Sequence, residues 1–212
     1  MTRLLLVRHG LTDWNAAQRF QGQHDVPLNE TGERQAAALA RRLAGEPLQD
    51  IYSSDLQRAL ATTSSIAAMR QACRVVIEPR LREVSFGEWE GLTYTEIAAR
   101  DPAGLAAWED NILENAPPGG ETLTQLAGRV QAVLGELLLA HTNETLLLVA
   151  HGGPLQVLVC LALGLPPGKY WQFHLSPGSL SEIAIYPQGA IVNLLNEEME
   201  PKMKSLTTDK RR

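Results

Sequence analysis

The sequence predicts an α/β protein: a three-layer α/β/α sandwich with a mostly parallel central sheet and one antiparallel strand. Short apolar runs alternate along most of the chain with longer segments of helical pattern, as in parallel sheets that carry helices on both faces. Two runs, Leu4–Val7 and Thr145–Ala150, are strongly apolar, which is typical of central strands. The 212 residues allow one or two domains, and we expect a single domain over residues 1–196.

The first part of the chain is expected to alternate between strands and helices. The expected elements are strands at 4–7, 50–53 and 74–77, a helix that includes 35–44, and a helix that begins near 55 and runs through 58 to about 69. Asn29 is suited to cap the first helix, which stops at Gly45. Ser53, Ser54 and Asp55 offer capping oxygens to the second helix.

The segment 81–118 interrupts this alternation, because glycines and prolines divide it into short helical pieces. We expect it to be an insertion over one edge of the sheet that caps the site. The elements expected after it are a helix at 121–141, a strand at 145–150, a helix at 154–163 and two antiparallel strands at 180–186 and 190–195. Residues 197–212 show little periodicity, and we expect an unstructured tail.

Composition excludes several classes of protein. The hydrophobic fraction of 44% and the charged fraction of 20% are ordinary for a globular protein. A net charge of -5 provides no general positive field, so we expect no nucleic-acid partner. The apolar runs are too short for a membrane span or a signal-peptide core, and two cysteines are too few for a disulfide framework. We therefore expect a cytoplasmic protein with no membrane partner.

Charged and titratable side chains follow three of the predicted strands. Arg8 and His9 follow the first strand, Arg58 follows the strand at 50–53, and His151 follows the strand at 145–150. Because parallel strands end at the same edge of a sheet, these side chains are expected to converge there. Arginine forks and free N–H groups at helix N-termini are the groups that bind a phosphate dianion. The sequence therefore predicts a phosphate site at this edge.

His9 is the expected nucleophile at that site. The neighbouring arginines lower the pKa of its imidazole, so the ring stays neutral at pH 7 with one nitrogen free to attack phosphorus. Its other nitrogen must donate to a carbonyl or a carboxylate that fixes the tautomer.

These residues belong to motifs that resemble those of the histidine phosphatase superfamily. Residues 8–15 read RHGLTDWN and match the pattern R-H-G-x-T-x-x-N. Five further blocks follow in the expected order: QGQHDVPLN at 21–29, SSDLQRA at 53–59, LREVSFGEWEG at 81–91, GGET at 119–122 and VAHGG at 149–153. The resemblance spans about positions 3–195.

The resemblance implies a catalytic role for five residues. His9 would become a phosphohistidine, and Arg8, Arg58 and His151 would form the rest of the phosphate pocket. Glu83 would protonate the leaving oxygen and then activate water. The chemistry supports this last role, because a carboxyl beside a bound phosphate dianion is hard to ionise and so is suited to donate a proton.

The resemblance also implies binding residues and no cofactor. Asn15, Gln21, Gly22 and Gly152 would bind the phosphoryl oxygens or the nearby substrate. No metal is expected, because the arginines and His151 would supply the positive charge that Mg²⁺ supplies elsewhere.

Two alternatives belong to other functional classes. A zinc site is disfavoured because the sequence has no His-x-x-x-His or Cys-x-x-Cys pair and the adjacent arginines would repel a divalent cation. A non-catalytic binder of phosphorylated ligands is disfavoured because His9 and Glu83 are both present.

Within the superfamily, the sequence favours a phosphatase over a phosphoglycerate mutase. The segment 91–117 is shorter than the insertion that mutases use to exclude water, and the block HGGPL at 151–155 is similar to the phosphatase branch. Together with FGEWEGL at 86–92, this block is similar to α-ribazole phosphatases and to broad-specificity members. The expected substrate is a small phosphate ester, with α-ribazole 5'-phosphate as one candidate, and the resemblance leads us to expect a homodimer.

Overall fold

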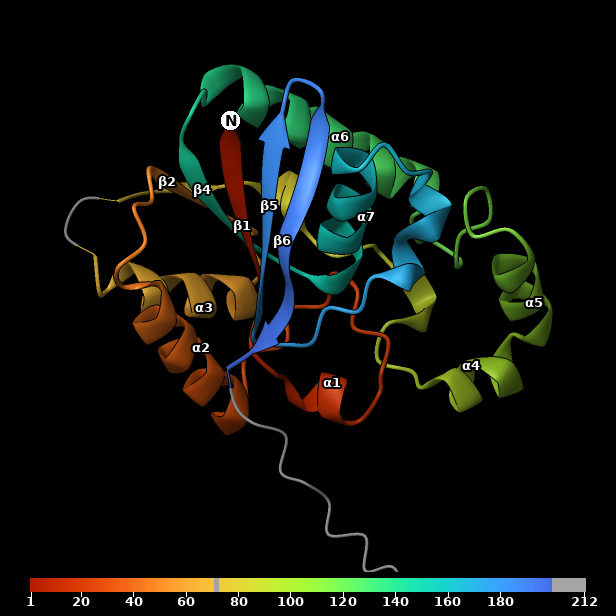
Figure 1. Cartoon of the computed structure of the whole chain (residues 1–212). Helices are drawn as coiled ribbons and strands as arrows, with labels where there is room; N and C mark the ends of the chain where they lie inside the picture. Colours follow the sequence, from red (N-terminus) through yellow and green to blue (C-terminus); the bar gives the residue numbers. More distant parts are fainter. Residues whose placement is uncertain (71–72, 200–212) are drawn as a thin grey trace, which may run out of the picture.

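The computed structural model describes residues 1–70 and 73–199, which form a six-stranded sheet with helices on both faces (Figure 1). The strands are β1 (Thr2–Arg8), β2 (Asp50–Ser53), β3 (Arg74–Ile77), β4 (Thr145–Ala150), β5 (Ser179–Tyr186) and β6 (Gly189–Glu198). The α-helices are α1 (Asp13–Ala16), α2 (Glu30–Leu43), α3 (Gln57–Ala67), α4 (Tyr94–Arg100), α5 (Pro102–Asp110), α6 (Leu123–Ala140) and α7 (Gly152–Ala162). Three 3₁₀ helices are η1 (Pro79–Leu81), η2 (Gly87–Trp89) and η3 (Pro167–Gln172).

The sheet has the strand order β3-β2-β4-β1-β5-β6. The pairings among β3, β2, β4 and β1 are parallel, and β5 runs antiparallel to both of its neighbours, β1 and β6. The α/β class and the mostly parallel sheet with one antiparallel strand are therefore confirmed.

The last strand is longer than predicted. β6 continues to Glu198, because Glu197 and Glu198 pair with Leu180 and Ser179 of β5. The Glu197 carboxylate also accepts a hydrogen bond of 3.1 Å from Arg42 on α2. The prediction that the unstructured tail begins at 197 is therefore wrong for these two residues, and residues 200–212 lie outside the described part of the chain.

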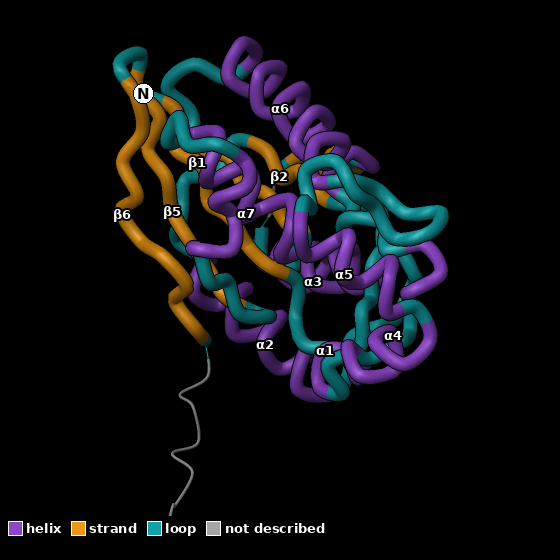
Figure 2. The backbone as a smooth tube through the Cα atoms, turned by 90° about the vertical axis from the view of Figure 1, so that its right-hand side faces the viewer, coloured by secondary structure: helices purple, strands orange, loops and turns teal. Residues whose placement is uncertain are grey.

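Two separate apolar cores lie on the two faces of the sheet. Leu4 and Leu6 of β1 belong to the core formed with α6 and α7, whereas Leu5 and Val7 belong to the core formed with α2 and α3. Successive side chains of a strand point to opposite faces, so a strand covered on both faces must be apolar throughout. Figure 1 shows α2 and α3 on one side of the strands and α6 and α7 on the other, and in Figure 2 β5 and β6 lie along one edge of the molecule.

Helix caps agree with the sequence in one case and differ in another. Asn29 accepts a hydrogen bond of 3.0 Å from Gly32 N and caps α2 as predicted. α3 begins after Leu56 without a side-chain cap from its N-cap residue. Its first N–H group, that of Gln57, donates instead to Asp25 Oδ1 at 2.7 Å. Asp55, which was expected to cap α3, binds Arg82.

The segment 81–118 carries η2, α4 and α5, and Figure 1 shows α4 and α5 standing to one side of the sheet. An aromatic cluster attaches this segment to the loop after α1. Phe20 contacts Phe86 edge-on with ring centroids 4.8 Å apart, and Trp108 packs edge-on against Trp89 at 5.8 Å. Phe20 and Trp108 also contact each other edge-on at 6.2 Å, so the cluster connects α5 with η2 and with the loop after α1.

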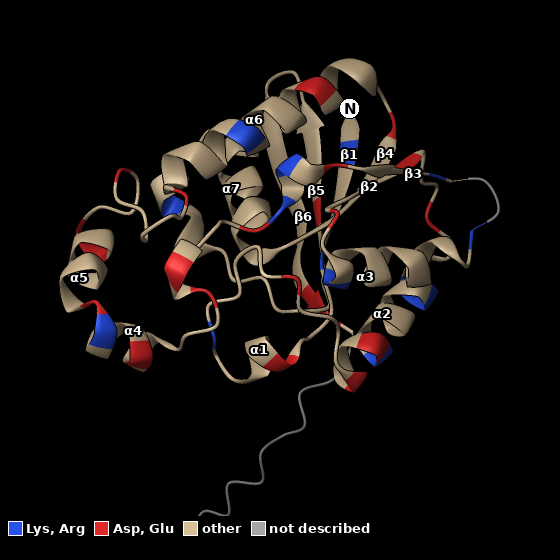
Figure 3. Ribbon diagram, turned by 180° about the vertical axis from the view of Figure 1, so that it is seen from behind, with Lys and Arg blue, Asp and Glu red and all other residues tan. Residues whose placement is uncertain are grey.

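Charged residues of both signs are spread over the helices and loops (Figure 3). Within the described residues, every helix is too short or too polar to cross a lipid bilayer. Cys73 and Cys160 are both free thiols.

Candidate active site

The parallel pairing of β1 and β4 brings two histidines together. Arg8 is the register partner of Ala150, so His9 and His151 leave the sheet from adjacent strands. The backbone N–H of His9 continues the ladder with a 3.0 Å hydrogen bond to Ala150 O. The two imidazole rings lie 4.9 Å apart between centroids. The structure thus brings together the strand ends as the sequence predicts.

His9 is 1% exposed, and its Nδ1 lies 2.7 Å from the carbonyl oxygen of Gly10. A carbonyl only accepts hydrogen bonds, so Nδ1 carries the proton and Nε2 keeps its lone pair. Burial lowers the pKa of His9 well below its usual value, and the positive charges of Arg58 and Arg8 lower it further. The neutral ring with a free Nε2 is the form that a nucleophile requires.

Arg58 is fully buried and holds three parts of the site in place. Its Nε donates to His151 Nδ1 at 3.2 Å, its Nη1 to the carbonyl of His24 at 2.8 Å, and its Nη2 to the carbonyl of Gly22 at 2.7 Å. Gly22 has a φ of +52°, a left-handed conformation that favours glycine. Burial lowers the pKa of Arg58 to about 10, so the side chain remains cationic at neutral pH.

His151 is fixed from both sides. Its Nδ1 accepts the hydrogen bond from Arg58, so its proton is on Nε2, which lies 2.8 Å from Ser54 Oγ. Burial lowers the pKa of His151 well below its usual value, and His9 and Arg58 act in the same direction. This geometry favours the neutral ring. The expectation that His151 supplies positive charge is therefore wrong, and the charge comes from the arginines.

The buried Nε of Arg8 is a hydrogen-bond donor without a partner among the described residues. The Nη1 of the same side chain donates to the carbonyl of Leu175 at 2.6 Å. An unsatisfied buried N–H is costly, and an anionic oxygen would satisfy it. Burial lowers the pKa of Arg8, and the charge of Glu83 opposes this shift.

Glu83 is held by backbone N–H groups. Its Oε1 accepts hydrogen bonds from Val84 N at 2.9 Å and from Gly153 N at 3.1 Å. Gly153 lies in the first turn of α7, and a Cβ atom at this position would overlap Glu83 Oε1. A Cβ at the neighbouring Gly152 would lie 3.4 Å from Arg8 Cζ. Small residues at these two positions therefore let the carboxylate and the guanidinium approach the helix.

The amide nitrogens of Asn15 and Gln21 make no hydrogen bond with any residue in the described part of the chain. Thr12 N donates to Asn15 Oδ1 at 3.3 Å, and Thr12 Oγ1 donates to Gln21 Oε1 at 2.8 Å. These contacts use the two amide oxygens and orient the amide groups. Both side chains line the same cavity as His9.

Two cavities meet beside these residues. The first, of about 300 Å³, is lined by Arg8, His9, Asn15, Gln18, Arg19, Phe20, Gln21, Gly22, Glu83 and Phe86. The second, of about 200 Å³, is lined by Arg8, Glu83, Val84, Phe86, Trp108, Ile112, Glu121, Leu123, Leu126, Gly152, Gly153, Gln156 and Tyr170. Arg8, Glu83 and Phe86 border both cavities and so mark their junction.

Residues 4–198 match the family model described as the histidine phosphatase superfamily, branch 1. The chain belongs to this superfamily. It is an enzyme of the histidine phosphatase type, and its sheet and flanking helices match those of solved members.

Similar members of the histidine phosphatase superfamily carry several different names. The chain is 34% identical over 196 residues to phosphoserine phosphatase 1 of Hydrogenobacter thermophilus, and the alignment covers 92% of this chain and 92% of that protein. It is 37% identical over 187 residues to a probable phosphoglycerate mutase, GpmB, of Photorhabdus laumondii, with 86% of this chain and 85% of that protein covered. The crystal structure of the α-ribazole phosphatase from Shigella flexneri superposes with a TM-score of 0.86 at 30% identity, over 92% of this chain and 96% of that one.

Several contacts of this histidine phosphatase site were not predicted from the sequence. The contact of Ser54 with His151 was missed, because Ser54 had been interpreted as a capping residue. The walls of the second cavity, among them Gln156 and Tyr170, come from segments far apart in the chain. The contiguous glycines at 152 and 153 were the one sequence signal for the close approach of Glu83 to α7.

Proposed function

We propose that this chain is a metal-independent phosphomonoesterase that hydrolyses a small phosphorylated metabolite through a phosphohistidine at His9. The observation that carries the proposal is the state of His9. Its ring is buried and neutral, its Nδ1 is held by the Gly10 carbonyl, and it lines a cavity with Arg8 and Glu83. A buried nucleophile with its free nitrogen toward an anion-binding cavity is suited to in-line attack on phosphorus.

In the first step, the lone pair of His9 Nε2 attacks phosphorus and the bond from phosphorus to the leaving oxygen breaks. Glu83, in its protonated form, gives its proton to that oxygen. Arg8 and Arg58 stabilise the negative charge on the three transferred oxygens, and the unused Nε of Arg8 can donate to one of them. Asn15 and Gln21 contribute amide donors, with the backbone of Gly22 and Gly152 nearby.

In the second step, the Glu83 carboxylate takes a proton from water as the water oxygen attacks phosphorus. The bond between phosphorus and Nε2 breaks, which releases inorganic phosphate and restores neutral His9. His151 does not enter either step as an acid or base, because Arg58 and Ser54 occupy both of its ring nitrogens. It acts as a positioning residue for Arg58.

Three further features belong to the proposal. Residues 1–198 form one domain that includes the whole of β6, with 81–118 as a cap over the site, and the protein acts in the cytoplasm without a cofactor. The free thiols of Cys73 and Cys160 are compatible with a reducing compartment. We expect a homodimer and a small-molecule substrate, with neither nucleic acid nor membrane as partner.

The proposal also includes a candidate for the substrate. α-Ribazole 5'-phosphate is a candidate, supported by the structural match to the Shigella α-ribazole phosphatase. Phosphoglycerate mutation is the second candidate function, because one relative carries the name of a probable phosphoglycerate mutase. The short segment 91–117 favours hydrolysis, since a mutase must keep water from the phosphohistidine.

The test is an assay with EDTA present on a panel of α-ribazole phosphate, phosphoserine, 3-phosphoglycerate and sugar phosphates. We expect released phosphate that survives EDTA, and a phosphorylated, acid-labile enzyme after quenching with labelled substrate. His9→Ala should abolish turnover and labelling while circular dichroism stays unchanged. Activity that persists in this variant would remove the phosphohistidine mechanism. Isomerised 3-phosphoglycerate without phosphate release would make the protein a mutase, and binding without any turnover would make it a phospho-ligand binder.

A further inference from the structure

The second cavity differs in chemistry from the first. Most of its wall is apolar and comes from six side chains: Val84, Phe86, Trp108, Ile112, Leu123 and Leu126. The first cavity instead contains His9, two arginines and three amide side chains. A phosphoryl group therefore belongs in the first cavity, and the second offers a site of another kind.

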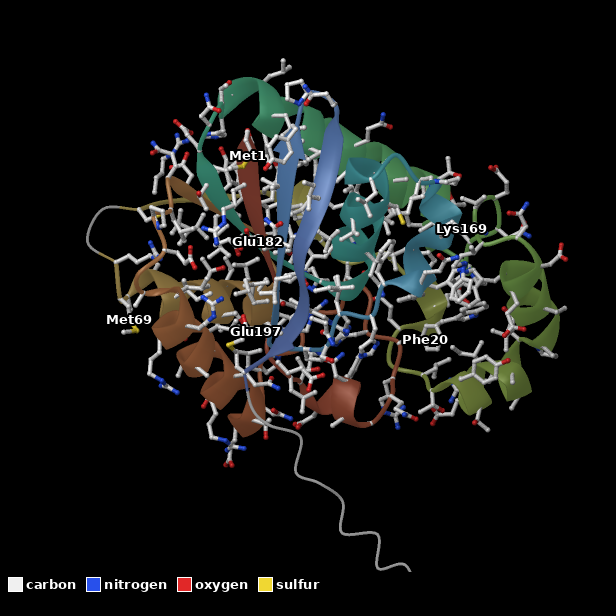
Figure 4. All side chains as sticks on the ribbon, in the orientation of Figure 1. Met1, Phe20, Met69, Lys169, Glu182 and Glu197 are labelled. Carbon is white, nitrogen blue, oxygen red and sulfur yellow. The ribbon has the colours of Figure 1, made fainter. Side chains whose placement is uncertain are left out.

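The shape of this apolar wall is set before a ligand arrives. Trp108 contacts Phe86 at 6.5 Å, Trp89 at 5.8 Å and Phe20 at 6.2 Å between ring centroids, all in edge-on geometry. Figure 4 labels Phe20 on the side of the molecule that faces α4 and α5. Because Trp89 is buried and its Nε1 donates to Asp101 at 3.2 Å, the cluster is anchored within the insertion. Such a wall holds a ring at little cost in conformational entropy.

The Glu121 carboxylate at the second cavity is already paired with Arg129, which lies behind the lining. Glu121 accepts hydrogen bonds from Arg129 Nε at 2.8 Å and from Arg129 Nη2 at 2.9 Å. The remaining contacts of Arg129 go to the carbonyls of Arg80, Arg82 and Glu83. Among the described residues, Arg8 is the only cation that lines this cavity, and it also lines the first.

Two uncharged polar groups remain available. The hydroxyl of Tyr170 makes no hydrogen bond with a residue in the described part of the chain, and burial and the charge of Glu83 raise its pKa, so it stays neutral. Gln156 Nε2 donates to the carbonyl of Phe173 at 2.5 Å, which leaves its Oε1 as an acceptor. The cavity thus offers one hydroxyl and one amide oxygen on an apolar background.

We infer that the second cavity receives the leaving group, and that it selects esters of uncharged, largely apolar alcohols, especially those with a ring, over esters that carry a carboxylate. The inference rests on the proposed function, in which Glu83 protonates the leaving oxygen. Glu83 and Arg8 border both cavities, so the ester oxygen lies at their junction and the alcohol extends into the apolar side.

A carboxylate in this cavity would lack a counter-charge of its own, because Arg8, the one cation among the described residues that line the cavity, is engaged by the phosphoryl group in the proposed function. It would lie near Glu83 and Glu121, and Arg129 has no donor left to offer. Desolvating an ion without a partner costs several kcal/mol. The competing place for a carboxylate is the far end of the first cavity at Arg19, which is bound to Glu96 at 2.9 Å and to the carbonyl of Gly91.

The test compares kcat/KM for benzyl, propyl and 2-carboxyethyl phosphates, which are all esters of primary alcohols and place a similar demand on Glu83. We expect benzyl phosphate to exceed propyl phosphate by roughly 30-fold, the gain from burying about 80 Å² of ring surface. 2-Carboxyethyl phosphate, whose leaving group carries a carboxylate and no ammonium, should fall below propyl phosphate by at least about ten-fold.

Ile112→Trp should fill the second cavity. We expect it to lower kcat/KM for benzyl phosphate by at least about ten-fold, with a much smaller effect on inhibition by inorganic phosphate, which binds in the first cavity. The matched control is Leu113→Trp, because Leu113 is the adjacent residue, is 36% exposed and lies outside the cavity lining. This control should behave as the unsubstituted enzyme does.

The outcomes separate the inference from the proposed function. Efficient hydrolysis of 2-carboxyethyl phosphate that is lost in Arg19→Gln would place the leaving group in the first cavity and overturn the inference, while the phosphatase would stand. Equal losses in the Ile112 and Leu113 variants would also overturn it. No phosphate release from any ester, p-nitrophenyl phosphate included, would remove the proposed function and the inference with it.

Discussion

Arg58 donates its Nε–H to Nδ1 of His151 at 3.2 Å, and both side chains are fully buried. The imidazole must be neutral, because a protonated Nδ1 could not accept this hydrogen bond. Ser54 completes the arrangement by accepting from Nε2 of the same ring. These two hydrogen bonds fix the His151 ring, and the ring in turn orients the guanidinium of Arg58. A guanidinium whose orientation is fixed in this way has the preorganisation expected of an anion site.

Ser54→Ala should therefore reduce activity through Arg58. The substitution leaves the buried Nε2–H of His151 without a partner, which costs about 1–3 kcal/mol and releases the ring. We expect kcat/KM to fall by about ten-fold or more.

Ser53→Ala is the matched control for Ser54→Ala. Ser53 is equally buried, but its hydroxyl bonds to Ser54 O and Thr63 instead of His151. Both variants should lose similar stability in urea unfolding, and only Ser54→Ala should lose activity. Equal activities of the two variants would show that the support of His151 is not needed.

Glu83→Gln tests the proton transfer. Glutamine keeps the shape of the side chain but cannot deliver a proton to the leaving oxygen. We expect esters of alkyl alcohols to slow by about 10²- to 10⁴-fold, while p-nitrophenyl phosphate, whose leaving group needs little protonation, slows far less. Steady-state kinetics on both substrates provide the measurement. Equal losses on the two would assign Glu83 another role.

The sequence predicted the central part of the site because that part depends on local patterns. Apolar runs located β1 and β4, and the rule that parallel strands end at one edge then brought His9 and His151 together. The cap of α3 was predicted wrongly for the opposite reason. Its donor is satisfied by Asp25, a residue 32 positions away whose approach depends on the folded loop.

The cavities could not be predicted from the sequence for the same reason. The second cavity combines Trp108 of α5, Leu126 of α6 and Tyr170 of η3, and no short-range pattern relates these three positions. The neutral state of His151 depends on Arg58 and Ser54, which are 93 and 97 positions distant along the chain. Contacts of this kind require the tertiary structure.

Gly153→Ala should impair catalysis more than stability. The added Cβ would overlap Glu83 Oε1, which is the flexible end of a side chain, so the carboxylate would move and lose its hydrogen bond from Gly153 N. We expect a loss of about ten-fold or more on alkyl esters and a smaller loss on p-nitrophenyl phosphate, as for Glu83→Gln.

The control for Gly153→Ala is the same substitution at Gly135. This residue is exposed within α6 and has open space around an added Cβ. Gly135→Ala should raise the free energy of unfolding by about 0.5–1 kcal/mol and leave kinetics unchanged. If Gly153→Ala retained full activity on alkyl esters, the position of the Glu83 carboxylate would not limit the reaction.

The two buried histidines of the site, His9 and His151, should make the protein less stable in mild acid. Burial and the arginines lower the folded-state pKa of His9 and His151, whereas a histidine in the unfolded chain has a pKa of about 6.5. As the pH falls below that value, the two histidines bind protons in the unfolded chain but not in the folded protein. The contribution of these two rings to the free energy of unfolding is therefore complete above about pH 6.5. It decreases as the pH falls below this value, until the folded-state pKa is reached.

Each histidine can contribute a slope of at most about 1.4 kcal/mol per pH unit over this range. Urea unfolding at pH 7.5, 6.5 and 5.5 measures the slope. Carboxylates also titrate at the acid end, so the informative quantity is the difference between the unsubstituted protein and His9→Asn, in which one titrating ring is absent. We expect a shallower slope in His9→Asn and a still shallower one when His151→Asn is added. The same slope in all three proteins would mean that these rings accept protons as readily in the folded state as in the unfolded chain, and the neutral nucleophile would lose its physical basis.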